Sequence, residues 1–228
     1  MEKSESLLSL YQALWNAYGP QGWWPGESPF EVIVGAILTQ NTAWVNVEKA
    51  IARLKETGVL TPEALARIPV EDLAPILKSS GYFNVKAGRL KSFITFLFEN
   101  YQGRLERMFR EDLPTLREKL LSVRGIGPET ADSILLYAGG YPIFVVDAYT
   151  RRVVSRHGLL PEDAGYDRIQ NRFMTQVPKD VRLFNEYHAL IVRVGKEFCR
   201  GTPRCRGCPL EPFLPIPGPD GPRPFDKN

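Results

Sequence analysis

The sequence predicts an all-α protein, and three observations support this prediction. Apolar residues recur at helical spacing from the first segment onward, for example at Leu7, Leu10 and Leu14. Proline stands where a helix would begin, at Pro62 and Pro128. Runs of residues that would suit β-strands are few, so we expect no sheet of consequence.

The composition limits the class of protein. The chain has 228 residues, of which 43% are hydrophobic and 24% charged, which is typical of a globular protein with one large domain or two small ones. A disordered chain, a collagen-like chain and a disulfide scaffold are excluded. The most apolar stretch, around 32–38, is far shorter than the ~20 residues of a membrane span, and the N-terminus lacks a secretion-signal pattern. We therefore expect a cytoplasmic protein with no membrane partner.

Helices are expected along most of the chain. Periodicity, caps and breakers predict helices at 7–15, 30–38, 63–68, 70–79, 86–101, 116–122, 128–138, 148–154, 166–176 and 181–198. The segment 30–38 is apolar nearly all round, as a buried helix would be. The last twenty residues contain seven prolines, so they should be extended and without a regular helix.

A glycine-rich turn separates two of these helices. Gly125 and Gly127 permit a tight hairpin that leaves backbone N–H groups accessible. Pro128 suits the first turn of the next helix, and Glu129 favours the positive end of that helix. Such a turn can bind a phosphate oxygen without regard to base sequence. A lone Gly-x-Gly can also be a purely structural turn between helices.

A carboxylate follows the apolar run 143–146. Asp147 stands directly before the predicted helix 148–154, so it can be the N-cap of that helix. It can also be a catalytic group desolvated at a cleft. The residues alone leave both interpretations open.

Positive charge and cysteine gather near the C-terminus. The net charge of the chain is only +3, but residues 179–206 carry seven Lys/Arg against three Asp/Glu, a local surplus of +4. A solvated basic face is the alternative to a nucleic-acid site there. All three cysteines, Cys199, Cys205 and Cys208, lie within ten residues of one another. This spacing favours metal ligands over a disulfide framework.

Together these pieces resemble the helix-hairpin-helix DNA glycosylases of the endonuclease III superfamily. The matching segments are VRGIGPETA at 123–131, VVDAYTRRV at 145–153, LTQNT at 38–42 and the cysteine cluster. They extend from about residue 30 to residue 209. The resemblance implies two helical domains that flank a DNA-binding cleft. One would be a helical barrel at 30–137, and the other would combine 1–27 with 138–228.

The resemblance also implies a partner and residue roles. The partner is double-stranded DNA containing a damaged base, which is flipped out of the duplex. The protein would act as a monomer, in the cytoplasm or on the nucleoid. Asp147 matches the catalytic aspartate of the family. The residues expected to contact DNA are Gln40 or Asn41 as a wedge, and Gly125, Gly127, Arg151, Arg200 and Arg204.

Two departures from the family pattern narrow the expected activity. Glu129 stands where bifunctional members carry the lysine that forms a Schiff base with the sugar, and a carboxylate cannot form that imine. Ala36 stands where adenine-specific members carry a protonating glutamate. One carboxylate is sufficient for an alkylated purine, because the cationic base leaves as a neutral molecule through an oxocarbenium-like transition state. We therefore expect a monofunctional glycosylase that acts on such purines.

The aromatic residues favour the same substrate. Trp24, Pro25 and Trp44 are expected to form a base pocket together with Glu129, because electron-rich rings hold a cationic base. Trp23 is expected in the core. The pattern looks most like the 3-methyladenine DNA glycosylases of the endonuclease III-like group. Two alternatives stay open: a bifunctional glycosylase/AP lyase acting on oxidised pyrimidines, and a non-catalytic helix-hairpin-helix DNA-binding module.

The resemblance implies an iron–sulfur loop, but this loop departs from the family. The family's four cysteines are separated by six, two and five residues. Here the spacers are five and two, and Leu214 stands at the fourth position. A [4Fe-4S] cluster with a non-cysteine ligand, a zinc ion and no metal are the alternatives, and a metal is preferred. Of the two histidines, His188 is expected to face the core, and His157 to lie near phosphate or at the surface.

Overall fold

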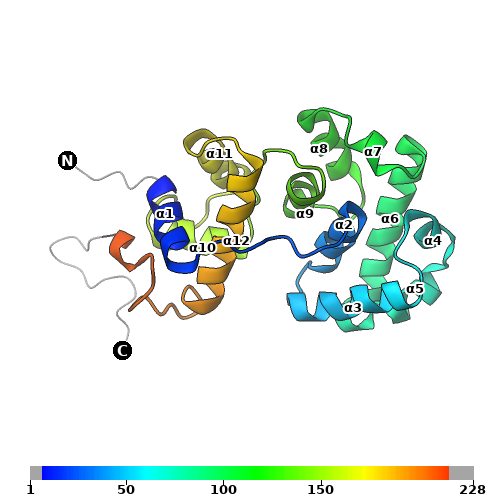
Figure 1. The fold of residues 1–228 in the computed structure, drawn as a ribbon, viewed down its shortest axis with the longest axis horizontal. Helices are drawn as coiled ribbons and strands as arrows, with labels where there is room; N and C mark the ends of the chain where they lie inside the picture. Colours follow the sequence, from blue (N-terminus) through cyan, green and yellow to red (C-terminus); the bar gives the residue numbers. More distant parts are fainter. Residues whose placement is uncertain (1–6, 216–228) are drawn as a thin grey trace. The chain divides into compact units, whose positions relative to one another are not determined.

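The computed structural model describes residues Leu7–Pro215 (Figure 1). No β-strand occurs within these residues, so the prediction of an all-α fold is confirmed. The α-helices are α1 (Leu7–Tyr18), α2 (Pro29–Leu38), α3 (Trp44–Glu56), α4 (Pro62–Arg67), α5 (Val70–Ile76), α6 (Phe83–Tyr101), α7 (Leu105–Met108), α8 (Leu113–Ser122), α9 (Pro128–Ser133), α10 (Ala148–Arg156), α11 (Tyr166–Gln176) and α12 (Val181–Glu197). Shorter helical turns are η1 (Lys78–Ser80), η2 (Ile134–Ala138) and η3 (Glu211–Phe213).

The chain divides into two compact units. The continuous unit is Trp24–Tyr141, and it contains the range 30–137 expected to form a helical barrel. The split unit combines Met1–Trp23 with Pro142–Asn228. Across Leu7–Pro215, no helix has both the length and the apolar character needed to cross a membrane.

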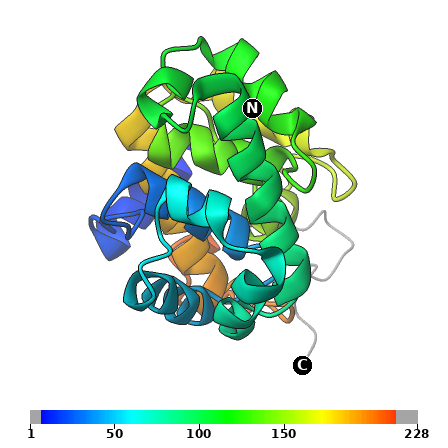
Figure 2. The same cartoon turned by 90° about the vertical axis from the view of Figure 1, so that its right-hand side faces the viewer.

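Helix α2 is the buried centre of the continuous unit. The Ser28 hydroxyl caps it by accepting a hydrogen bond from the N–H of Glu31 (3.2 Å), and Pro29 occupies its first turn. Every residue from Phe30 to Leu38 is buried, as the all-round apolar sequence predicts. Helix α2 packs against α3, α6, α9 and η2. Figure 2 shows the long helix α6, against which α4, α5 and α7 also pack.

Helix α12 has the corresponding place in the split unit, where it packs against α10 and α1. Beside it, the ring of Phe144 stacks on Phe173 with 3.9 Å between centroids, and Tyr187 meets both rings edge-on. The Tyr187 hydroxyl donates to the Leu7 carbonyl (2.7 Å), which ties α1 to α12. Because Phe144 lies three residues before Asp147, this aromatic cluster anchors the segment that leads into Asp147.

Several elements differ from the sequence-based expectations. Helix α3 was not predicted, and its N-cap residue Ala43 provides no side-chain cap. Helix α6 begins at Phe83, before the expected 86, because a left-handed Tyr82 turns the chain into it. The predicted helix 70–79 ends at Ile76 and continues as η1, and 128–138 ends in the π-helical η2. In the proline-rich end, η3 forms one 3-10 turn, and 216–228 lie outside the described residues.

Candidate functional site

The hairpin between α8 and α9 contains two glycines, which differ in backbone conformation and in the space available for a side chain. Gly125 has φ +89°, and a Cβ there would lie 2.4 Å from Cγ of Arg89, so the fold itself requires glycine at this position. Gly127 has φ −95° and ψ 179°, which any residue adopts, and a Cβ there would meet nothing within 4 Å. Gly127 is exposed at the N-terminus of α9. The fold therefore gives no steric reason for glycine at 127.

Gln40 joins the hairpin to the end of α2. Its Nε2 donates to the Gly125 carbonyl (3.0 Å) and to Oγ1 of Thr130 (2.8 Å), and its Oε1 accepts from Arg89. Asn41, in contrast, is exposed and has a left-handed backbone with φ 54°. Of the two residues expected to be the wedge, Gln40 is held against the hairpin and Asn41 faces solvent.

Three aromatic side chains of the continuous unit gather around α2. The Trp24 ring lies 5.1 Å from Trp44, edge-on, and 5.0 Å from Tyr137. A Cβ on Gly35 would lie 3.4 Å from both tryptophans, so glycine at this position lets the rings approach the helix. Tyr137 was missed by sequence reasoning, because it and Trp24 stand 113 positions apart in the sequence. It lies in η2, and π-helical turns are frequent at functional sites.

The other expected pocket residues lie outside this ring cluster. Pro25 is exposed, and Glu129 is exposed in the first turn of α9. Trp23, expected in the core, is half-buried. The structure therefore brings Trp24 and Trp44 together and adds Tyr137 to them.

Asp147 is buried at the N-terminus of α10. Its Oδ1 accepts hydrogen bonds from the N–H of Thr150 (2.7 Å) and from the Thr150 hydroxyl (2.9 Å), so the carboxylate is the N-cap of the helix. Its Oδ2 lies 3.6 Å from Nε2 of His188. One oxygen is thus occupied by the helix, and the capping bonds fix the position of the other.

His188 is the residue whose relation to Asp147 the sequence did not reveal. It is buried on α12, as expected for a core-facing position. Burial lowers its pKa, while the charge of Asp147 raises it. Because Asp147 and His188 stand 41 positions apart in the sequence, no local pattern could have indicated that they meet.

The arginines expected at DNA have different surroundings. Nη1 of Arg151 donates to the Ala164 carbonyl (3.0 Å), so this side chain braces the loop before α11. Arg200 and Arg204 are exposed. Nδ1 of His157 lies 3.0 Å from the Phe213 carbonyl, and burial lowers the pKa of its imidazole.

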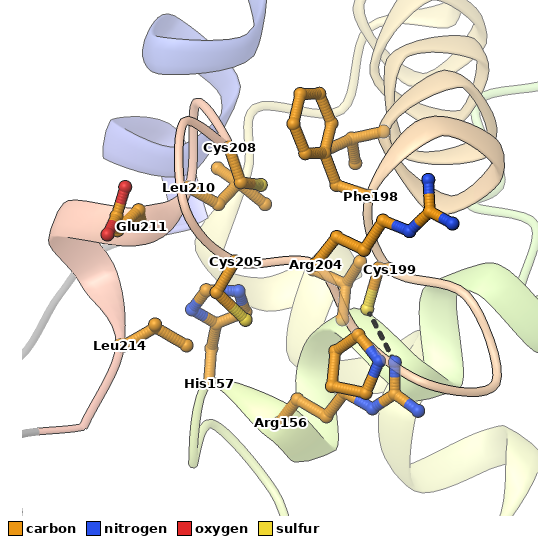
Figure 3. A pocket seen from close by; sticks show the side chains of 13 residues that line it. Arg156, His157, Phe198, Cys199, Arg204, Cys205, Cys208, Leu210, Glu211 and Leu214 are labelled. Atoms are coloured by element: carbon orange, nitrogen blue, oxygen red, sulfur yellow. Dashed lines mark hydrogen bonds between the residues drawn. The ribbon is translucent and has the colours of Figure 1, made fainter. Parts of the chain in front are cut away.

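The three cysteines line one pocket of the split unit (Figure 3). None of them forms a disulfide, and each is half-buried. Burial raises the pKa of the Cys208 thiol to about 11, with the nearby Cys205 and Cys199 adding to the shift. Nη1 of Arg156 donates to Sγ of Cys199 (3.2 Å), and this is the contact drawn as a dashed line in Figure 3. Leu214 lines the same pocket.

The comparison with protein families decides the identity. Residues 34–179 match the model of the HhH-GPD superfamily base excision DNA repair proteins. The chain belongs to this superfamily. The expected resemblance to endonuclease III-like DNA glycosylases is therefore confirmed, and this HhH-GPD chain is a DNA glycosylase of base excision repair.

Individual relatives of this HhH-GPD glycosylase agree with the assignment to the family. The chain is 47% identical to the "Putative DNA repair glycosylase MJ1434" of Methanocaldococcus jannaschii, over 92% of this chain and 96% of that one. It is 30% identical to endonuclease III of Thermotoga maritima, over 80% and 81%. A solved structure of the 3-methyladenine DNA glycosylase MagIII of H. pylori, bound to 1,N6-ethenoadenine, superposes with a TM-score of 0.69 at 30% identity, covering 83% of this chain and 93% of that one.

A second solved structure extends the likeness of fold. A trapped covalent endonuclease III–DNA intermediate superposes with a TM-score of 0.78 at 24% identity, covering 90% of this chain and 92% of that one. A further complex of endonuclease III with DNA is non-covalent, with a TM-score of 0.76. These two neighbours show the likeness of fold, and the match to a base excision DNA repair family supports DNA as the partner of this glycosylase.

The cysteine loop has fewer thiols than the iron–sulfur loop that the family resemblance implies. Three thiols are present, but Leu214 at the fourth position has no donor atom. Within Leu7–Pro215, no group of three or more His, Cys, Asp or Glu side chains is arranged to hold one metal ion. The residues therefore do not fit a four-thiolate cluster. In the described structure the loop is held by arginines: Arg156 donates to the Arg200 (2.6 Å) and Gly201 (2.9 Å) carbonyls, and Arg152 to that of Cys199 (2.8 Å).

Proposed function

We propose that this glycosylase is monofunctional, hydrolyses the N-glycosidic bond of alkylated purines of the 3-methyladenine type, and leaves an abasic site. The observation that carries the proposal is Glu129 in the hairpin, at the position where a lysine would form the Schiff base of a lyase. Glu129 is exposed at the start of α9. The 30% identity to a 3-methyladenine DNA glycosylase bound to 1,N6-ethenoadenine supports the substrate class.

Asp147 is proposed to carry the chemistry. In an N3- or N7-alkylated purine the base is already cationic, so breaking the bond from C1′ to nitrogen returns the bonding electrons to the base and neutralises it. Positive charge then develops on the sugar. A carboxylate fixed at a helix N-terminus stabilises that charge and orients the water that adds to C1′, and the proton that this water loses is released to solvent. No general acid is needed to protonate the leaving base.

The ring cluster of Trp24, Trp44 and Tyr137 is proposed to recognise the base. The ring centroid of Trp24 lies 5.1 Å from that of Trp44 and 5.0 Å from that of Tyr137. An electron-rich face holds a cation more strongly than a neutral molecule, by about 0.5–2 kcal/mol per ring. This difference favours an alkylated base over the unmodified bases, which carry no charge.

Borohydride trapping separates hydrolysis from lyase chemistry. We expect no covalent protein–DNA adduct when the glycosylase is incubated with alkylated DNA and sodium borohydride, because no imine forms without the hairpin lysine. A bifunctional endonuclease III on thymine-glycol DNA is the positive control, measured on the same denaturing gel. A trapped adduct with this chain would contradict monofunctional hydrolysis.

The released base identifies the substrate. We expect free 3-methyladenine to appear by chromatography from alkylated DNA, and no free base from DNA carrying thymine glycol. Release from thymine-glycol DNA alone would favour the bifunctional alternative. Binding without release from either substrate would favour the non-catalytic module.

The metal content of the cysteine loop is a separate prediction, and no step above depends on it. From the cysteine spacing we propose that the loop binds an iron–sulfur cluster with a non-cysteine ligand, which requires the three thiols to move together from their positions in the described structure, where they are not arranged to hold one ion. Protein purified without oxygen should then contain iron and sulfide and absorb near 400 nm, roughly where thiolate-to-iron bands fall. Colourless protein with neither iron nor zinc by elemental analysis would show that the arginine contacts alone hold the loop.

A further inference from the structure

A buried lysine joins two loops of the continuous unit. Lys86 on α6 is 1% exposed. Its Nζ donates to Oγ1 of Thr42 (2.6 Å) and to the Ser80 carbonyl (2.5 Å). The Thr42 hydroxyl also donates to the same carbonyl (2.5 Å). These three groups form a closed triangle between the loop after α2 and the turn η1, and we call it the Lys86 clamp.

Each clamped loop presents an exposed residue in a left-handed conformation. Asn41, next to Thr42, has φ 54°, and Tyr82, two residues after Ser80, has φ 45°. Tyr82 is 73% exposed, which is unusual for a large aromatic side chain. Non-glycine residues rarely adopt this backbone region, and they keep it only where the surroundings impose it. The clamp lies between these two positions and supplies such a constraint.

The exposed pair has the chemistry that a disrupted duplex requires. An amide can donate to and accept from a base that has lost its partner. An aromatic ring can stack where a base has been removed, with any sequence. Gln40, the other amide of this loop, is bonded at both ends to the hairpin and to Arg89. Asn41 and Tyr82, in contrast, both have exposed side chains.

We propose that Lys86 is a positioning residue, which holds the Asn41 and Tyr82 loops as one rigid edge that inserts at the gap left by a displaced nucleotide. The proposal rests on DNA binding by this glycosylase and does not depend on which base is excised. Lys86 itself is buried and would touch neither DNA nor the reacting atoms.

The electrostatics agree with a clamp. Burial, together with the positive charge of Arg89 on the same helix, lowers the pKa of Lys86 to about 8. The groups that contact it from the other two segments are uncharged, a hydroxyl and a carbonyl. The charge-assisted hydrogen bonds of the ammonium should therefore weaken as the pH rises through about 8.

The test measures how much more tightly the protein binds a duplex with an abasic site than an undamaged duplex. Affinity is compared between a duplex with a tetrahydrofuran abasic-site analogue and the matched undamaged duplex. In Lys86→Met we expect the preference for the duplex with the abasic-site analogue to fall about 10- to 100-fold, which is the scale of the effect when a positioning group is misplaced. Affinity for the undamaged duplex should stay within about twofold, because the hairpin contact to phosphate carries no lesion information.

A second lysine of α6 provides the matched control. Nζ of Lys91 donates to the carbonyls of Leu65 (2.8 Å), Ala66 (2.9 Å) and Ile68 (2.7 Å) at the end of α4, away from both clamped loops. Lys91→Met removes a similar set of hydrogen bonds and should leave the preference unchanged. Equal losses in the two variants would reduce Lys86 to a general structural role.

Two further variants keep the test decisive if Lys86→Met folds poorly. Thr42→Val removes one acceptor and leaves the lysine in place, and it should lower the preference in the same direction. Lys86→Arg keeps the charge and should restore part of the preference for the abasic-site duplex.

In the wild-type protein the preference should decline between pH 7 and 9, with no such decline in Lys86→Met. An undiminished preference in folded Thr42→Val and a flat pH profile in the wild-type protein would overturn the proposal. Because the tetrahydrofuran site has no base, these outcomes are independent of the proposed substrate.

Discussion

Replacing Asp147 with asparagine is expected to lower the single-turnover rate of base excision by about 100- to 1000-fold, the range found when one electrostatic stabiliser is removed from a site. Asparagine has nearly the same shape but no charge to stabilise a cationic sugar. It is also a good N-cap, so α10 should stay intact. Duplex affinity should remain within about twofold. Excision is measured as released base under single-turnover conditions, and binding by fluorescence anisotropy.

A second capping aspartate offers the control for this prediction. Asp180 caps α12 in the same way, with Oδ1 accepting from the N–H of Leu183 (2.8 Å), and Asp180→Asn repeats the chemical change in the same unit. We expect that variant to excise at the normal rate. If Asp147→Asn and Asp180→Asn were equally active, Asp147 would be a helix cap and nothing more.

Replacing Gly127 with valine is expected to weaken binding to damaged and undamaged duplex alike, by about 10- to 100-fold. This range corresponds to losing about 1.5–3 kcal/mol from a hydrogen bond to a charged group. The backbone at Gly127 accepts any residue and an added Cβ meets nothing within 4 Å, so the fold should be unaffected. The added methyl groups would instead occupy the space in front of the α9 N-terminus, where a phosphate would bind.

Gly165 is the matched control for Gly127. It is also the exposed N-cap of a helix, α11, with φ −65°, ψ 163° and nothing within 4 Å of an added Cβ. Gly165→Val should leave both affinities unchanged. Gly125 is unsuitable for the comparison, because its positive φ and the contact with Arg89 would disturb the fold. Normal affinity of Gly127→Val for plain duplex would mean that the hairpin is only structural.

Features encoded by neighbours in the sequence were predictable. The buried helix α2 follows from an apolar run behind Ser28 and Pro29, and α9 begins at Pro128 as expected. Asp147 stands at the start of α10, as its place between an apolar run and a helical pattern predicted. Helix α3 was missed although Val47, Ala50, Ile51 and Leu54 recur in it at helical spacing, and its capping residue Ala43 gave no start signal.

Features encoded by distant contacts were not predictable. Gln40 was expected as a wedge from its short motif, yet its amide bonds to residues 85 and 90 positions away. Lys86 is part of the segment GYFNVKAGRL, where a lysine on a helix would ordinarily be solvated. Its burial appears only once α6, η1 and the loop after α2 are packed together.

The capping role of Asp147 has a practical consequence. Asparagine meets the needs of the helix but not those of the reaction, so stability and turnover can be separated at this single position. A folded, inactive protein that still binds DNA would retain damaged duplex instead of processing it. Immobilised Asp147→Asn protein could therefore enrich modified fragments from chemically treated genomic DNA, and mass spectrometry of the retained nucleosides would reveal which lesions the enzyme selects.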